Sequence, residues 1–365
     1  MRVLAVNAGS SSLKLRLLGD ADEQLEAADL PADAGGFDSS ALTSAMADWP
    51  RPDVVVHRIV HGGTEFTAAV RIDDDVERRL RALTDLAPLH QPKSLAGLDA
   101  VASVLPDVPA VACFDTAFHA SLSPAARTYA VPEEWRQRYG VRRYGFHGLS
   151  HAYAAQRGAE VAGLPLADTR VVTCHLGAGA SLCAVRDGRS VDTTMGFTPL
   201  EGLVMATRSG TVDPGLVLWL EEHEHLSPRE VATALEERSG LAALAGTADM
   251  REVEDRALAG DERAQLGLEV YLHRLVGGIA TMAAAIDGLD LVVFTGGVGE
   301  HSPIVRAAVA ARLRWLGMVI HDDGNADAAG DADITSVGAE VRTVVVTARE
   351  DLQMAREARA ISAAG

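Results

Sequence analysis

The order of apolar and polar positions at the start of the chain is that of a β-hairpin. Residues 3–6 are apolar, residues 7–12 are small or polar, and residues 13–17 alternate between leucine and a basic side chain. Such a pattern predicts two paired strands, the second of them half buried. The order of strand, small-residue turn and strand returns at residues 171–185, and Asp187-Gly188 then supplies a further hairpin turn. This repeat predicts an internally duplicated protein with two domains.

Strands and helices alternate through the rest of the chain. Further strands are predicted where apolar residues cluster, at 53–60, 108–114, 291–294 and 344–346. Helices are predicted to begin after serine caps at Ser227 and Ser302, to run through 264–287, and to end the chain from Glu350 onward. Residues 23–50 show only a weak strand–turn–helix pattern. The alternation in both halves predicts an α/β fold.

Composition and charge narrow the class of protein. The 365 residues are 48% hydrophobic and 23% charged, which suits two globular domains. Because 33 basic side chains face 51 acidic ones, the net charge is −18, and we expect no binding to nucleic acid or to an anionic membrane. No apolar run is long enough for a membrane span, and residues 3–6 are too short for a secretory leader. The three cysteines lie in apolar runs, so we expect them to be buried free thiols. Because free thiols are typical of a reducing compartment, we expect a cytoplasmic protein.

Small-residue turns between strands are candidate phosphate sites. They lie at residues 7–12, 175–179 and 296–299, the last of them ahead of a predicted helix. Turns of this kind let backbone N–H groups approach phosphate oxygens closely, although tight hairpins use the same residues. The chain has neither a Walker A sequence nor a Rossmann G-x-G-x-x-G at its start. Phosphate binding therefore points to another architecture.

Several charged residues lie at the ends of apolar segments. Arg58 and Arg208 each adjoin a glycine turn. A guanidinium there can bind a carboxylate or phosphate in a bidentate manner, or it can form an ordinary surface ion pair. Asp115 and Glu350 follow strands, where they can bind Mg²⁺ or cap a helix. His147 and His151 are spaced like zinc ligands but lack the glutamate of H-E-x-x-H, and Gly148 disfavours a helix between them. Hydrogen bonding to a charged substrate is the better interpretation of these histidines.

Together these segments resemble the acetate kinase family of short-chain carboxylate kinases over nearly the whole chain. The resemblance rests on residues 6–14, 57–63, 87–92, 114–119, 144–151, 196–202, 207–210 and 296–300. That family belongs to the actin/hexokinase/Hsp70-like superfamily. The resemblance therefore implies two duplicated ribonuclease H-like α/β domains around a cleft. They would span 1–148 and 149–351, with a C-terminal helix at 352–365 packing back on the first.

The resemblance also implies reversible phosphoryl transfer from ATP to acetate, giving acetyl phosphate and ADP, in a homodimer that uses Mg²⁺ or, as an alternative ion, Mn²⁺. Matched motif by motif, the expected catalytic residues are Asp115, His147 and Arg208, and the expected metal-binding residues are Asn7 and Glu350. The acetate-binding residues would be Arg58, Val60, Leu89, His90, Phe146 and Pro199. The nucleotide-binding residues would be Lys14, His175, Leu176, Gly177, Ala178, Gly179, Asp249, Met250, Arg251, Gly297, Val298, Gly299, Glu300 and His301.

Some positions depart from the family pattern. Ala178 stands where an asparagine is usual, His301 stands where asparagine is common, and Arg349 adds a cation beside Glu350. Three alternatives to phosphoryl transfer from ATP to acetate stay open. One is a propionate or butyrate kinase, one is a different phosphoryl donor such as pyrophosphate, and one is a protein that binds nucleotide or acyl phosphate without turnover. Gly297 argues against pyrophosphate because a glycine leaves room for adenosine. Met195, Trp219 and Trp315 are expected in the core or in an interface, as is the helix around 271–286.

Overall fold

The computed structural model describes residues 1–9, 12–31, 37–84 and 91–364. The predicted site residues Leu89 and His90 lie outside them. The chain forms two compact units. Unit 1 comprises residues 1–120, 146–153 and 349–365, and unit 2 comprises residues 121–145 and 154–348.

Unit 1 is built on a six-stranded sheet with the order β3-β2-β1-β4-β6-β5. Its strands are β1 (Val3–Ala8), β2 (Ser12–Leu18), β3 (Gln24–Pro31), β4 (Val54–Ile59), β5 (Val70–Arg71) and β6 (Ala110–Phe114). The first three are antiparallel neighbours, β1, β4 and β6 run parallel, and β5 returns antiparallel to β6. The predicted N-terminal hairpin is confirmed, with Asn7 opposite Lys14.

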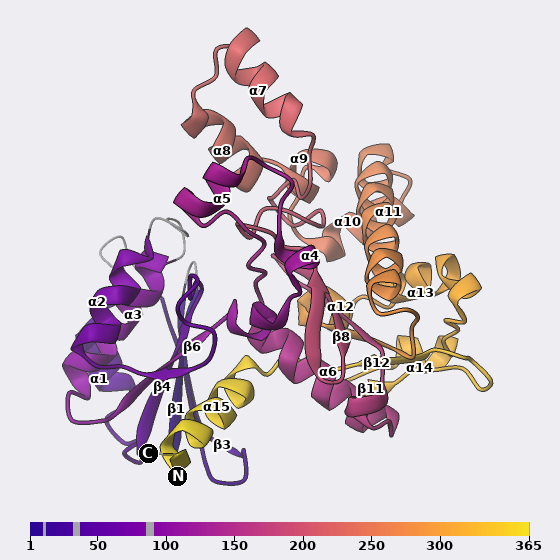
Figure 1. Ribbon diagram of the computed structural model, residues 1–365. Coiled ribbons are helices and arrows are strands. Elements are labelled where there is room, and N and C mark those ends of the chain that lie inside the picture. The colour runs from indigo at the N-terminus through magenta and orange to yellow at the C-terminus, as the bar shows by residue number, and fades with distance from the viewer. Residues whose placement is uncertain (10–11, 32–36, 85–90, 365) are drawn as a thin grey trace. The chain divides into compact units, whose positions relative to one another are not determined.

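Helices cover both faces of the unit 1 sheet (Figure 1). On one side lie α1 (Ser39–Ala45), α2 (Asp74–Ala82) and α3 (Gln91–Val104), and on the other lies α15 (Glu350–Ala364). The alternation in β2 explains the packing, because Leu13, Leu15 and Leu17 are fully buried and join Leu42 of α1 in one core. The terminal helix α15 packs on β1, β4 and β6.

Unit 2 repeats the plan with the sheet order β11-β12-β10-β7-β8-β9. Its strands are β7 (Val171–Leu176), β8 (Ala180–Arg186), β9 (Arg189–Thr193), β10 (Leu291–Thr295), β11 (Ala332–Asp333) and β12 (Arg342–Val345). As in unit 1, three neighbouring strands are antiparallel, here β7, β8 and β9. Strand β7 also pairs in parallel with β10, and β10 pairs in parallel with β12. The short strand β11 ends the sheet and runs antiparallel to β12. The predicted duplication and α/β class are therefore confirmed.

The remaining helices belong mostly to unit 2. They are α4 (Pro124–Arg127), α5 (Glu133–Tyr139), α6 (Gly148–Ala162), α7 (Pro214–His223), α8 (Pro228–Glu237), α9 (Gly240–Ala245), α10 (Met250–Leu258), α11 (Glu262–Ala285), α12 (Gly296–His301), α13 (Pro303–Arg312) and α14 (Asp322–Ala326). Short 3₁₀ turns lie at 117–121, 166–168 and 314–316. The long helix α11 packs on β7, β8 and β9, and Gly278 permits the approach because a Cβ there would lie 2.7 Å from Leu182.

Some local predictions are confirmed and others are wrong. Ser227 and Ser302 cap their helices, and the three cysteines are buried and free. Residues 296–299 are not a loop ahead of a helix but the first turn of α12, and Gly148 begins α6 instead of interrupting it. The sequence predicts Trp219 and Trp315 in the core or in an interface; they are 46% and 72% exposed in the chain, so only the interface stays open for them.

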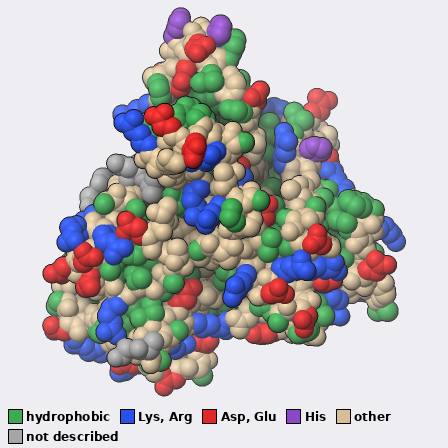
Figure 2. Space-filling model, in the orientation of Figure 1, with side chains coloured by type: hydrophobic (Ala, Val, Ile, Leu, Met, Phe, Trp, Pro, Cys, Tyr) green, Lys and Arg blue, Asp and Glu red, His purple; other side chains and the backbone are tan. Residues whose placement is uncertain are grey.

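The surface carries a mixture of basic and acidic side chains (Figure 2). On the face drawn in Figure 2, basic side chains lie among acidic ones and form no continuous patch over the described residues. Among those residues, no helix is both long and apolar enough to cross a membrane.

Candidate active site

A buried ion pair joins two neighbouring parallel strands of unit 1. Arg58 lies in β4, and Asp115 directly follows β6, where Ile59 pairs with Phe114. The Arg58 Nε and Nη2 atoms donate to the two Asp115 carboxylate oxygens at 2.8 and 2.6 Å. This bidentate geometry fixes the guanidinium plane. The Asp115 side chain is only 2% exposed.

Two more side chains extend the pair along the same edge of the sheet. The Arg58 Nη1 donates to Asn7 Oδ1 at 3.1 Å, and Asn7 Nδ2 donates to Glu350 Oε2 at 3.0 Å. Asn7 comes from β1, and Glu350 is the first residue of α15. The Arg58 Nη1 also lies 3.7 Å from Glu350 Oε2. Side chains far apart in sequence thus meet because the parallel strands end together.

Burial and charge act in opposite directions on this cluster. Burial opposes the charge on Arg58, but the carboxylates of Asp115 and Glu350 outweigh it and raise the Arg58 pKa, so the guanidinium stays protonated. Burial raises the pKa of Asp115 and the charge of Glu350 adds to the rise, whereas Arg58 and the backbone N–H of His147 oppose it. Every strong donor around the Asp115 carboxylate stabilises its charged form.

His147 lies beside this cluster in a conformation that few residues other than glycine adopt. Its φ is +58°, and its backbone N–H donates to the Asp115 carboxylate. The half-buried imidazole lies with its ring centre 6.5 Å from that of His151. The preceding Phe146 is buried, with its ring edge-on to His61 at 5.5 Å.

Arg208 of unit 2 is a half-buried cation with neutral partners. Its Nη1 donates to the Pro199 carbonyl at 3.1 Å and lies 3.7 Å from the Met205 sulfur. It forms no ion pair with any residue that the structure describes. Burial lowers the Arg208 pKa, and the more distant Glu236 opposes that shift. Such a guanidinium keeps N–H donors and a poorly compensated charge for an anion.

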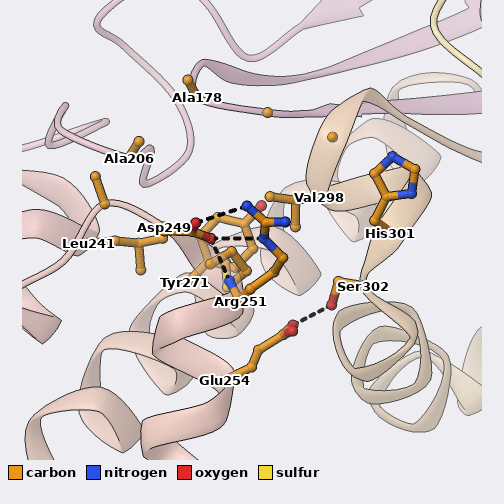
Figure 3. A pocket seen from close by; sticks show the side chains of 14 residues that line it. Ala178, Ala206, Leu241, Asp249, Arg251, Glu254, Tyr271, Val298, His301 and Ser302 are labelled. Carbon is orange, nitrogen blue, oxygen red and sulfur yellow. Dashed lines mark hydrogen bonds and ion pairs between the residues drawn. The ribbon is translucent and has the colours of Figure 1, made fainter.

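Unit 2 also contains a cavity of about 360 Å³ (Figure 3), which is within the usual size range of small-molecule sites. Most of its wall is apolar or glycine. At one side Asp249 caps α10 and pairs with Arg251 at 3.1 Å. The lining residues are Gly177, Ala178, Ala206, Leu241, Ala248, Asp249, Met250, Arg251, Glu254, Tyr271, Gly297, Val298, His301 and Ser302.

Two neighbouring groups in the cavity wall are polar and buried. Glu254 accepts a hydrogen bond from the Ser302 hydroxyl, and burial raises its pKa. The Tyr271 hydroxyl is buried and forms no hydrogen bond with any described residue. Burial also raises the pKa of Tyr271, so this group is neutral.

Comparison with known proteins now gives the family. The model of the acetokinase family matches residues 40–356. The acetate kinase of Carboxydothermus hydrogenoformans is 38% identical over 390 residues, and the match covers 98% of each chain. The chain belongs to the acetokinase family.

Solved structures agree with this family assignment. An acetate kinase from Porphyromonas gingivalis superposes with a TM-score of 0.90 at 34% identity and 99% coverage of both chains. A propionate kinase from Francisella tularensis also gives 0.90, at 32% identity and 98% coverage of both. A ROK hexokinase from Thermus thermophilus, with a TM-score of 0.51 and 15% identity, shares the fold alone. This match agrees with the predicted fold type.

The site residues expected of an acetokinase family member fall into two groups. Unit 1 holds Asn7, Arg58, Asp115 and Glu350 in direct contact, with His147 and Phe146 adjoining them. Lys14 is exposed and lies opposite Asn7 in the β1–β2 ladder, and Val60 follows β4.

In unit 2, the cavity includes eight of the expected nucleotide residues, namely Gly177, Ala178, Asp249, Met250, Arg251, Gly297, Val298 and His301. His175, Leu176, Gly179, Gly299 and Glu300 are not among its lining residues. Glu300 instead accepts from the backbone N–H groups of Gly296 and Ala348, both at 3.0 Å. It therefore fixes the start of α12.

The cavity also contains residues that the sequence analysis missed. Glu254 could have been found, because it lies three residues after Arg251 on the same face of α10. Tyr271 lies in α11 and Ser302 lies between α12 and α13, and only the folded structure brings them to the cavity.

Proposed function

We propose that this chain is an ATP:acetate phosphotransferase that forms acetyl phosphate and ADP reversibly. The observation that carries the proposal is the Arg58 cluster. Three of the five guanidinium N–H donors are engaged by Asp115 and Asn7, and the other two form no hydrogen bond with any described residue. A guanidinium held in this way offers two N–H groups to a small carboxylate.

The proposed reaction is a direct in-line transfer. A carboxylate oxygen of acetate forms a bond to the γ-phosphorus, and the bond between that phosphorus and the β–γ bridging oxygen breaks, leaving its electron pair on ADP. Acetate is already ionised at neutral pH, so no general base is needed. The Asp115 carboxylate accepts from Arg58 and from the His147 N–H, and this supports an orienting role without proton transfer.

Cationic and donor groups support stabilisation of the transferring phosphoryl group. Arg208 has no carboxylate bonded to it within the described residues, and His147 adjoins the Arg58 cluster through its backbone N–H, which donates to Asp115. We assign both to the phosphoryl oxygens, where charge–dipole and charge–charge interactions lower the barrier. The nucleoside would occupy the cavity bordered by Gly177, Gly297 and Arg251. By motif, the residues that we assign to the methyl group of acetate are Val60, Leu89, His90, Phe146 and Pro199.

The donor set of the cluster fits Mg²⁺. Glu350 and Asn7 present oxygen atoms at a partly exposed edge, with Glu350 15% exposed. Mg²⁺ prefers one or two such oxygens, with water and phosphate completing its shell. We assign Mg²⁺ binding to Asn7 and Glu350, where the ion would neutralise phosphate charge. The same oxygen donors would accept Mn²⁺.

We further propose a cytoplasmic homodimer. Three free cysteines, all buried, suit a reducing compartment. Leu216, Leu218 and Trp219 of α7 are each between 45% and 57% exposed, and an apolar face of this kind supports association with a second copy.

Propionate is the second candidate substrate, favoured by the structural match to a propionate kinase. One additional methylene changes binding in an apolar pocket by about 1–3 kcal/mol. The preference between the two acids therefore depends on details around Val60 and Phe146 and has to be measured.

A hydroxamate-trap assay with Mg-ATP tests the proposal. Acetate, propionate and butyrate are compared for the wild type, Arg58→Ala, Arg58→Lys and the control Arg51→Ala at an exposed position. We expect acetate-dependent product that falls by about 100-fold or more in Arg58→Ala, and also in Arg58→Lys, because an ammonium group cannot reproduce the bidentate geometry. Equal product from the wild type and both Arg58 variants would remove the proposed substrate site. No product from the folded wild type with any acid would favour binding without turnover.

A further inference from the structure

The joint between β6 and α6 in unit 1 has no room for a side chain at Gly148. The Gly148 N–H donates to the Asp115 carbonyl oxygen at 2.8 Å. A Cβ at Gly148 would lie well inside contact distance of that oxygen and 2.9 Å from the Phe118 Cβ. Both obstacles are short and stiff, because one is backbone and the other is the first atom of a side chain. Only glycine fits here without displacing its neighbours.

The same joint holds His147 in its unusual conformation. His147 has a φ of +58°, donates its own N–H to the Asp115 carboxylate, and accepts the first hydrogen bond of α6 from the His151 N–H at 2.9 Å. Two successive N–H groups, those of His147 and Gly148, therefore both point at Asp115. A non-glycine residue with positive φ persists only where its surroundings enforce it.

Asp115 thus links two groups that the proposed reaction needs. Its side chain holds the Arg58 guanidinium from one side and the His147 backbone from the other. Its carbonyl oxygen holds the start of α6 through Gly148. These contacts fix the His147 backbone, from which the ring extends, relative to Arg58.

We propose that Gly148 is a positioning residue for phosphoryl transfer, because its missing Cβ lets α6 dock on Asp115 and so fixes the His147 imidazole relative to Arg58. This inference rests on the proposed function. It assigns Gly148 no contact with substrate, and its effect is transmitted only through His147.

A double-mutant cycle tests this relation. The variants are Gly148→Ala, His147→Ala and the double variant, with kcat and KM for acetate measured in each. Displacing a catalytic group by about 1 Å can cost about 100-fold, so we expect Gly148→Ala to lower kcat by about that factor and to change KM by less than about threefold. In the His147→Ala background, Gly148→Ala should lower kcat no further, because the group it positions is gone. Independent losses in kcat that multiply in the double variant would overturn the proposal.

Gly277→Ala is the matched control. Gly277 lies inside α11, and a Cβ there meets no atom within 4 Å. We expect unchanged kcat in this variant, so a loss in Gly148→Ala is not a general effect of replacing glycine by alanine in a helix.

If Gly148→Ala does not fold, amide hydrogen exchange of the wild type tests the proposal instead. The His147 and Gly148 amides should be protected to the same degree as the amides inside β6, because both donate to Asp115. Exchange as fast as in exposed loops would overturn the proposal. A wild type without acetate-dependent ADP release would contradict the proposed function instead, and the two failures are therefore distinguishable.

Discussion

At the scale of single residues, Arg58 is held in place before any substrate binds. Three hydrogen bonds to Asp115 and Asn7 fix its plane, so little side-chain entropy remains to be lost when a carboxylate arrives. Arg208 is the complementary case, because its partners are carbonyl and thioether groups and its charge is left for a ligand. One arginine is oriented by a carboxylate, and the other keeps its charge uncompensated.

Replacing Asp115 by asparagine should separate orientation from proton transfer. Asp115→Asn keeps the shape but directs an NH₂ group at one of the Arg58 donors or at the His147 N–H. We expect kcat to fall by about 100-fold, while the pH dependence of kcat/KM keeps its form because no proton is removed by this group. Steady-state kinetics across pH provides the measurement, with Asp29→Asn on the exposed strand β3 as control. An unchanged kcat, or the loss of an acidic limb of the profile, contradicts the orienting role.

At the scale of elements, the sequence was informative wherever a local pattern determines the structure. Leucine alternation identified β2, and the Ser227 and Ser302 caps located two helix starts. The errors at Gly148 and Gly296 share a cause, since glycine disfavours a helix in isolation. Gly296 has a φ of +79° and lies against the Leu176 backbone, and Gly148 lies against Asp115. Contacts distant in sequence decide both positions, and a local pattern does not contain them.

Strand β4 should make the stability of the protein depend on pH. Burial lowers the pKa of His57 to about 4, compared with about 6.5 in an unfolded chain. The folded protein therefore favours the neutral form of His57. The contribution of neutral His57 to the free energy of unfolding is complete above about pH 6.5 and is lost as the pH falls towards 4. At about pH 5 the loss from His57 is about 2 kcal/mol.

Urea unfolding at about pH 7 and about pH 5 measures this loss. His57→Gln lacks the titrating ring and should lose about 2 kcal/mol less than the wild type between the two values. Exposed His223 supplies the control, and His223→Gln should follow the wild type. Identical pH dependence in the wild type and His57→Gln would contradict burial as the cause.

At the scale of the whole molecule, the same strand topology occurs in both units, but each unit carries a different part of the candidate site. Each unit has three antiparallel strands, two parallel ones and a short antiparallel edge. Unit 1 places the Arg58–Asp115 pair at the ends of its parallel strands, whereas unit 2 places a cavity between α10, α11 and α12. The sequence singled out Arg58, Asp115 and Glu350 because they lie at or near the ends of apolar segments, and the family resemblance added Asn7. It missed Tyr271 and Ser302 because only the packing of helices brings them to the cavity, whereas Glu254 lies on the same face of α10 as Arg251 and could have been found.

Binding of Mg-ATP should slow backbone hydrogen exchange in one part of the molecule. We expect slower backbone hydrogen exchange in residues 249–254 and 296–301 of unit 2, because bound nucleoside would fill the cavity that these segments border. Exchange measured by mass spectrometry with and without Mg-ATP checks this, with acetate alone as the control ligand. Protection confined to unit 1 would place the nucleotide elsewhere.

The path of the chain has a consequence for how the protein is made. Helix α15 carries Glu350 and covers β1, β4 and β6, although those strands are synthesised first. Every strand and helix of unit 2 emerges from the ribosome while one face of the unit 1 sheet still lacks its cover. Unit 1 therefore stays without this cover until residues 350–364 have been synthesised. A nascent chain that stalls before residue 350 contains Arg58 and Asp115 but lacks the carboxylate at the start of α15, and it exposes the valine-rich strands β1 and β4 to chaperones and proteases.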